Sequence, residues 1–243
     1  MIQAGIYKAI IFDVGDTLLT REPSSHDLLI KKCQEIGLSL NESTARSAFK
    51  QAEIWAGNQT LCEMNGETRM PDKEFDQHFF MTVLRTAFKE KAEDELVQLK
   101  NQLKAMPSPK QAWVLVSGVH QTLKKLKESE VILGIASNFD ETLPDRCDQL
   151  GLTPYFDTIV VSSLVGVEKP NPEIMRIACH RLDIAPSASL YVGDHPLDVF
   201  CAKEAGMSVA WLCDPKDMLP EQVRHQADYR IHSLGEITVR LGI

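Results

Sequence analysis

The sequence predicts an α/β fold: a doubly wound, mostly parallel β-sheet core with an all-helical domain inserted near its start. Two patterns support this prediction. From about residue 112 onward, short apolar runs alternate with helical patterns, which favours right-handed βαβ units. Between about residues 20 and 106, apolar residues instead recur at three- and four-residue spacing, which is typical of amphipathic helices. The 243 residues are enough for both parts. We expect the core at 1–19 and 107–243, and a helical cap at 20–106.

The first elements predicted along the chain are one strand and four helices. Residues 8–12, KAIIF, form a compact apolar run that fits a strand buried on both faces. The helices are expected within SSHDLLIKKCQEIGL, NESTARSAFKQAEIWAG, DKEFDQHFFMTVLRTAF and AEDELVQLKNQLKAM, with Asn41 and Asp72 as N-caps. TREP at 20–23 and MPSPKQ at 106–111 are expected to link this segment to the core, so that it forms a mobile cap.

The remaining elements alternate between helix and strand. We expect helices in GVHQTLKKLKES, in NPEIMRIACHRLDI with Asn171 as N-cap and Pro172 at the first helical position, and in PLDVFCAKEAG, which ends at Gly206. ETLPDRCDQLGL is expected to be a helix broken at Pro144. The predicted strands are VILGIAS, DTIVVSS, SLYVGD, MSVAWLC and YRIHSL, the last followed by a short terminal helix.

Composition and charge restrict the class of protein. The net charge of −8 and the pI of about 5.4 argue against a nucleic-acid partner. The six cysteines are scattered and form no CxxC pair, which favours free thiols in a reducing compartment. We find no run of about 18 apolar residues and no signal-peptide pattern, so we expect no membrane association. These observations predict a cytoplasmic protein.

Polar residues that follow the predicted strands indicate a site. Ligands of such sheets bind outside the carboxyl ends of the strands. An aspartate there can act as a nucleophile, and Mg²⁺ allows several carboxylates to lie close together despite their repulsion. A serine hydroxyl and a lysine ammonium can hold phosphoryl oxygens. The residues at these positions are Asp13, Ser137, Asn138, Lys169, Asp194 and Asp198.

Four short motifs occur in an order and spacing that resemble a known superfamily. DVGDTLL, ASN, VEKPNP and VGDHPLD resemble the four motifs of the haloacid dehalogenase-like hydrolases. The resemblance covers the whole chain, and SNFD, KPNPEIM and VGDHPLDVFCAKEAGM look closest to phosphatase-like members. It implies a Rossmann-like core, a helical cap inserted after the first motif, and a Mg²⁺-dependent phosphatase that acts on a small phosphorylated substrate.

The resemblance also implies roles for individual residues. Asp13 matches the nucleophile, which forms an aspartyl-phosphate, and Lys169 matches the lysine that pairs with the nucleophile and the phosphate. Ser137 matches the hydroxyl that holds the phosphate, with Asn138 beside it, and Thr17 matches a threonine that secures the first loop. The implied metal ligands are Asp13, the backbone carbonyl of Gly15, Asp194 and the supporting carboxylate of Asp198.

The first motif departs from the usual Asp-x-Asp-Gly-Thr of these phosphatases, in which the second aspartate is the general acid and base. Gly15 occupies that position here, and Asp16 stands where glycine is expected. A shifted loop could let Asp16 act as the catalytic acid. The enzyme could instead act on good leaving groups or run slowly. The chemistry could also need no acid, as in the superfamily's dehalogenases and phosphonate hydrolases.

The alternatives differ in what they require. Dehalogenation needs no metal, so the pair Asp194 and Asp198 favours phosphoryl transfer. Phosphonate hydrolysis needs a cap lysine, and no motif distinguishes Lys31, Lys32 or Lys50. A catalytically weak or non-enzymatic member that binds a phospho-ligand or a protein is the remaining alternative. Residues 20–30 and 57–70 are where we expect substrate specificity to lie.

Overall fold

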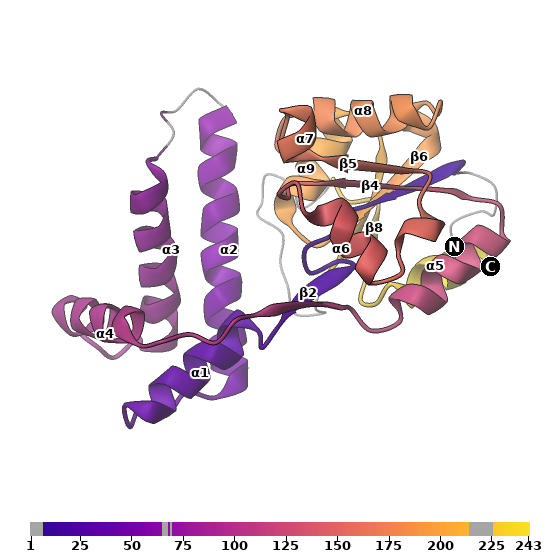
Figure 1. Ribbon diagram of the computed structural model, residues 1–243. Coiled ribbons are helices and arrows are strands. Elements are labelled where there is room, and N and C mark those ends of the chain that lie inside the picture. Colours follow the sequence, from indigo (N-terminus) through magenta and orange to yellow (C-terminus); the bar gives the residue numbers. More distant parts are fainter. Residues whose placement is uncertain (1–6, 65–67, 69, 214–225) are drawn as a thin grey trace. The chain divides into compact units, whose positions relative to one another are not determined.

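The computed structural model describes residues 7–64, 68, 70–213 and 226–243 (Figure 1). Part of the 57–70 segment, to which the sequence assigned specificity, lies outside these residues. The chain divides into two compact units: unit 1 comprises Met1–Thr20 and Val114–Ile243, and unit 2 comprises Arg21–Trp113. The sequence placed the end of the helical segment at 106, and residues 107–111 form neither helix nor strand.

Unit 1 contains a six-stranded sheet in which all paired strands are parallel. The order is β5 (Thr158–Val161), β4 (Ile132–Ser137), β1 (Ala9–Phe12), β6 (Ser189–Gly193), β7 (Ser208–Leu212) and β8 (Tyr229–Ile231). Every residue of β1 and β6 is buried, as expected for strands covered on both faces. The predicted α/β fold with a mostly parallel sheet is confirmed.

Helices cover both faces of this sheet. In Figure 1, α7 (Ser162–Val165), α8 (Glu173–Arg181) and α9 (Pro196–Glu204) lie on one side, and α5 (Val119–Glu128) and α6 (Leu143–Gln149) lie on the other. The C-terminal helix α10 (Gly235–Leu241) packs beside α5. Short 3₁₀ turns occupy Thr153–Tyr155 and Pro186–Ala188. The core against α8 and α9 includes Ile11, Ala136, Tyr191 and Trp211.

Two details of these helices differ from the sequence prediction. Pro144 does not break α6, because it lies in the first turn, where the missing N–H has no intrahelical acceptor to lose. Helix α8 begins at Glu173 rather than at Pro172, which is its N-cap residue. The side chain of Asn171 still caps the helix, since its Oδ1 accepts a hydrogen bond of 3.0 Å from the N–H of Glu173.

A separate two-stranded sheet was not predicted. It consists of β2 (Leu19–Glu22) and β3 (Ala112–Leu115), and the unit boundaries fall within these two strands. The segment TREP, predicted as a linker, therefore contributes three residues to β2. Its polar side chains carry no apolar alternation that would have indicated a strand.

Unit 2 is built around four helices among its described residues: α1 (Ser25–Glu35), α2 (Glu42–Met64), α3 (Asp72–Ala87) and α4 (Glu93–Ala105). Apolar side chains from all four helices form its core. Asn41 caps α2 as predicted, since its Oδ1 accepts a hydrogen bond of 2.8 Å from the N–H of Thr44. The prediction for Asp72 is wrong by one residue: α3 begins at Asp72, and Pro71 is the N-cap. Among the described residues, none of the helices is long and apolar enough to cross a membrane.

Candidate active site

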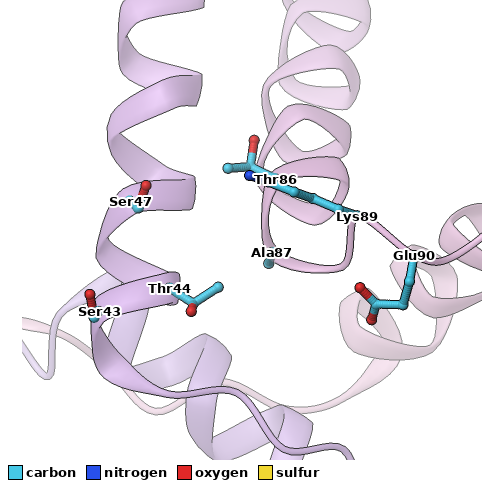
Figure 2. A pocket seen from close by; sticks show the side chains of 7 residues that line it. All are labelled: Ser43, Thr44, Ser47, Thr86, Ala87, Lys89 and Glu90. Carbon is cyan, nitrogen blue, oxygen red and sulfur yellow. The ribbon is translucent and has the colours of Figure 1, made fainter.

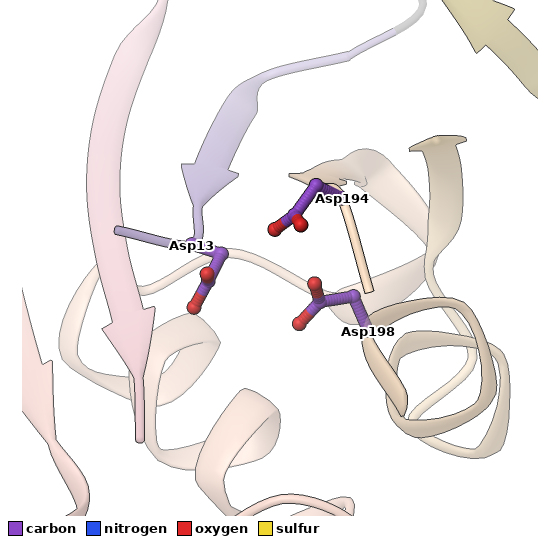
Figure 3. A group of neighbouring side chains, drawn as sticks. All are labelled: Asp13, Asp194 and Asp198. Carbon is purple, nitrogen blue, oxygen red and sulfur yellow. The ribbon is translucent and has the colours of Figure 1, made fainter. Parts of the chain in front are cut away.

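Three carboxylates meet at the carboxyl edge of the unit 1 sheet. Asp13 directly follows β1, where its N–H donates to the carbonyl of Val192, and Asp194 directly follows β6. Asp198 lies in the first turn of α9. Figure 3 shows the three side chains gathered at this edge, and one oxygen of each lies within 4.8 Å of the others. The sequence prediction placed these residues around one crevice, and the structure brings them together.

The first turn of α9 fixes Asp198 in this cluster. His195 is the N-cap of the helix and Pro196 is its first residue, while Asp198 Oδ2 accepts a hydrogen bond of 2.9 Å from the N–H of His195. The side chain of Asp198 is fully buried against the backbone of Gly193. A Cβ at Gly193 would lie 2.4 Å from Asp198 Oδ2, so only glycine fits there.

Lys169 supplies the positive charge. Its Nζ lies 2.6 Å from Asp13 Oδ1 and 2.6 Å from Asp198 Oδ1, and 3.3 Å from the hydroxyl of Tyr191. Burial disfavours the ammonium, but the carboxylates of Asp13 and Asp198 outweigh burial and raise the pKa of Lys169. The lysine therefore stays charged, and all three of its N–H donors have acceptors.

The formal charges of this cluster do not balance. Three carboxylates and one ammonium leave two formal negative charges in this cluster. Burial, and to a smaller extent the charge of Asp198, raise the pKa of Asp13, while Lys169 and a hydrogen bond from Ser137 oppose that shift. The ligand atoms are carboxylate oxygens, which suit a hard divalent cation such as Mg²⁺. The residues present therefore fit such an ion.

The side chain of Asn138 forms two hydrogen bonds with the backbone of Lys169. Its Nδ2 donates to the carbonyl of Lys169 at 2.9 Å, and its Oδ1 accepts from the N–H of Lys169 at 2.7 Å. This pair of hydrogen bonds ties the end of β4 to the loop that carries the lysine. The sequence prediction made Asn138 a phosphate-binding residue, and this role stays a prediction; the structure shows its amide bonded to the backbone of Lys169. Ser137, the buried last residue of β4, faces Asp13, as its hydrogen bond shows.

The loop after Asp13 is a tight turn around the carbonyl of Val14. That oxygen accepts from the N–H groups of Thr17, Leu18 and Leu19. The hydroxyl of Thr17 donates to Asp194 Oδ1 at 3.2 Å, so this threonine links the loop to the acidic cluster. The loop is therefore held both by its own backbone and by a member of the site.

Asp16 does not join the acidic cluster. It has a φ of 49°, in the left-handed region, and its N–H donates to the carbonyl of Leu19. Its exposed carboxylate accepts a hydrogen bond of 2.7 Å from the hydroxyl of Thr20. Gly15 has no positive φ, and a Cβ built on it has no heavy atom within 4 Å. The catalytic role suggested for Asp16 stays a prediction.

Sequence reasoning missed two aromatic residues that support the site. The buried hydroxyl of Tyr191 in β6 donates to the carbonyl of Ala136 at 2.7 Å and accepts from Lys169. The indole N–H of Trp211 in β7 donates to the carbonyl of Asp194 at 2.7 Å. Both were read only as strand residues, because nothing in a single sequence shows which buried aromatic places its polar end against a site.

Unit 2 also contains a hollow, between the start of α2 and the end of α3 (Figure 2). Its volume is about 390 Å³. It brings together no group of metal-ligating side chains, unlike the cluster in unit 1. The lining residues are Ser43, Thr44, Ser47, Thr86, Ala87, Lys89 and Glu90.

Comparison with known proteins gives consistent matches over most of the chain. A family model described as haloacid dehalogenase-like hydrolase matches residues 10–212. Haloacid dehalogenase-like hydrolase domain-containing protein 3 of Mus musculus is 26% identical over 217 residues, which are 89% of this chain and 86% of that protein. Glyceraldehyde 3-phosphate phosphatase of Methanopyrus kandleri is 30% identical over an alignment of 242 positions that covers 95% of this chain and 95% of that protein. The crystal structure of a HAD phosphatase from Thermococcus onnurineus has a TM-score of 0.57 at 25% identity, covering 97% of this chain and 98% of that one.

Proposed function

Because the chain belongs to the haloacid dehalogenase-like hydrolase family, we propose that it is a Mg²⁺-dependent phosphatase that acts through an aspartyl-phosphate on Asp13. The single observation that carries this proposal is the ion-paired cluster of Asp13, Lys169, Asp194 and Asp198 at the carboxyl edge of the sheet. A carboxylate nucleophile, a fixed ammonium and an acidic cation site are the parts that phosphoryl transfer requires.

The residues that would hold the metal are Asp13, Asp194 and the backbone carbonyl of Gly15, with Asp198 in support. When bound, Mg²⁺ would neutralise negative charge on the carboxylates and on the transferring phosphoryl group. Asp198 also accepts from Lys169 and from the N–H of His195, so its orientation is fixed by the protein itself. Thr17 orients Asp194 through a hydrogen bond to its carboxylate, and Trp211 does so through a hydrogen bond to its backbone carbonyl.

Each residue of the site would have its own role in the reaction. An oxygen of Asp13 attacks phosphorus, forming a new P–O bond while the bond to the leaving oxygen breaks. Lys169 stabilises the charge that develops on the phosphoryl oxygens, and Asn138 holds the lysine loop in place. The hydroxyl of Ser137 lies at Asp13, where it can bind another phosphoryl oxygen. Water then cleaves the P–O bond to Asp13 and releases phosphate.

The nature of the substrate is also part of the proposal. The Methanopyrus kandleri relative is named as a phosphatase of glyceraldehyde 3-phosphate, which supports a small phosphorylated metabolite as substrate. The net charge of −8 argues against nucleic acid as a partner. We propose that unit 2 is the cap of this enzyme. We also propose a cytoplasmic location, which the six cysteines, present as thiols rather than disulfides, support.

Two alternative reactions are less well supported. A phosphonate hydrolase needs a free cap lysine, yet the ammonium of Lys32 donates to the carbonyls of Leu103 at 3.0 Å and Met106 at 3.1 Å, at the end of α4. A dehalogenase would have no use for the carboxylates of Asp194 and Asp198. A member that binds a phospho-ligand without turnover is favoured by one observation, the absence of a side chain at Gly15.

Phosphate release from a panel of phosphorylated metabolites tests the proposal. We expect turnover that needs Mg²⁺ and disappears in the Asp13→Asn variant, because an amide cannot form the phosphoryl-enzyme. Asp140→Asn is a matched control, since Asp140 is exposed and its carboxylate accepts from the N–H and the hydroxyl of Thr142 in its own turn. Turnover that survives in Asp13→Asn would contradict the proposal, and binding of phosphate without turnover would favour the non-enzymatic alternative.

A further inference from the structure

The groups around Asp13 point to a particular class of substrate. Resting on the proposed phosphatase function, we infer that the preferred substrates are phosphoanhydrides and acyl phosphates. In both, the leaving oxygen belongs to a phosphate or a carboxylate and departs as a stable anion at neutral pH. The inference rests on where unit 1 directs its N–H and O–H donors.

No proton donor is offered by the loop that follows the nucleophile. Gly15 has no side chain, although the space beside its Cα is open. The carboxylate of Asp16 is exposed and already accepts from Thr20, on a turn that its own backbone closes through Leu19. The hydroxyl of Thr17 donates to Asp194. Each of these three consecutive positions therefore has no proton directed at a leaving group.

The deeper donors are also used within the protein. The three N–H groups of Lys169 face Asp13, Asp198 and Tyr191. The hydroxyl of Tyr191 is fully buried and donates to the carbonyl of Ala136. His195, beside Asp194, accepts at Nδ1 from the N–H of Leu197 as the cap of α9, so this ring nitrogen has no proton to give. Among the described residues of unit 1, the ammonium of Lys169, the hydroxyl of Tyr191 and Nδ1 of His195 are therefore engaged within the protein itself.

The consequence follows from the bonds that change. When Asp13 forms its bond to phosphorus, the electron pair of the breaking P–O bond goes to the leaving oxygen. An alkoxide needs a proton at that moment, and the lack of a general acid typically lowers the rate by about 10²–10⁴-fold. A phosphate or carboxylate leaving group needs none. The aspartyl-phosphate is itself an acyl phosphate, so its hydrolysis releases the Asp13 carboxylate without an acid, and the proton lost by the attacking water passes to solvent.

The dependence of rate on the leaving group tests this inference. We would measure kcat/KM with Mg²⁺ for acetyl phosphate, pyrophosphate, a series of substituted phenyl phosphates and glycerol 1-phosphate. Log kcat/KM should fall steeply as the pKa of the leaving group rises. We expect acetyl phosphate and pyrophosphate to exceed glycerol 1-phosphate by about 10²-fold or more.

Variants at Gly15 provide the matched comparison. Gly15→Asp adds an acid at an open position, and Gly15→Asn adds a side chain of the same size that has no acidic proton. Gly15→Asp should raise the ratio of the glycerol 1-phosphate rate to the acetyl phosphate rate by about 10²-fold, whereas Gly15→Asn should not. Circular dichroism and Mg²⁺ affinity of both variants establish that the site has folded.

Three results would overturn the inference. A shallow dependence on leaving-group pKa in the wild type means that an acid acts in the first step. If Asp16→Asn or His195→Asn makes a shallow dependence steep, that residue is the acid. In both cases Mg²⁺-dependent phosphate release persists, and the proposed function stands. The absence of release from every compound of the series, by contrast, removes the proposed function and this inference with it.

Discussion

Replacing Gly193 with alanine should disrupt the acidic cluster, whereas the same replacement at Gly15 should not. The new Cβ would lie 2.4 Å from Oδ2, 2.5 Å from Cγ and 2.8 Å from Cβ of Asp198. Asp198 cannot rotate away freely, because it is fully buried and holds Lys169 at 2.6 Å and the N–H of His195 at 2.9 Å. The clash must therefore shift the backbone or break one of these contacts.

The size of the effect follows from these two possibilities. Overpacking a well-packed site costs about 1–3 kcal/mol, and breaking a buried ion pair costs about 3–5 kcal/mol. We expect the free energy of unfolding to fall by about 3 kcal/mol, which for this length lowers Tm by roughly 6–12 °C. Mg²⁺ affinity should fall as well, because Asp198 supports the proposed metal site.

Thermal unfolding followed by circular dichroism, together with titration calorimetry of Mg²⁺, checks both effects. Gly15→Ala is the control, since its Cβ has no heavy atom within 4 Å and its φ is not in the left-handed region. Like Gly193→Ala, the Gly15→Ala variant adds one methyl group beside the acidic cluster. If Gly193→Ala keeps the wild-type Tm and the wild-type Mg²⁺ affinity, the close packing of Asp198 against Gly193 does not fix the cluster, and our reasoning is wrong.

Two further predictions concern buried groups of the core. Tyr191→Phe leaves the carbonyl of Ala136 and one N–H of Lys169 without their partner, so stability should fall by about 1–3 kcal/mol and kcat should fall more than KM changes. Tyr7→Phe, which removes a hydroxyl bonded to Tyr229, should leave kcat unchanged, and equal loss of kcat in both variants would argue against a positioning role. Burial raises the pKa of the Cys201 thiol to about 12, so its contribution to stability is complete below about pH 8.5 and is lost as pH rises toward 12. Urea unfolding should show that the free energy of unfolding of the wild type is lower at pH 10 than at pH 8, and that this decrease is smaller in Cys201→Ala. An equal decrease in the wild type and the variant would show that Cys201 is not its source.

The parallel core could be predicted because its strands are buried on both faces. AIIF in β1 and SLYVG in β6 are short apolar runs bounded by polar residues, and helical patterns separate them from the next strands. The polar strand β2, LTRE, escaped notice because its pairing with β3 depends on a segment about ninety residues away. Local patterns carry no information about such a partner.

The site was predictable to the extent that strand ends locate it. Asp13, Ser137 and Asp194 stand at the ends of β1, β4 and β6, and parallel strands bring such positions to one edge. The contacts of Asn138 and Tyr191 with Lys169 were not predictable in this way. These contacts depend on how loops and side chains cross the sheet, and they leave no local pattern in the sequence.

The exchange at Gly15 and Asp16 can now be explained in structural terms. The left-handed position of the loop is at residue 16, where glycine is normally favoured and aspartate is among the side chains that tolerate it. Asp16 occupies this position with its carboxylate bonded to Thr20, so the turn is formed without glycine there. Glycine at 15 is required neither by backbone conformation nor by packing. The structure thus gives no support to a loop shifted to recruit Asp16. Folding does not require glycine at position 15. The absence of an acidic side chain there is therefore better explained by the proposed chemistry of the substrate.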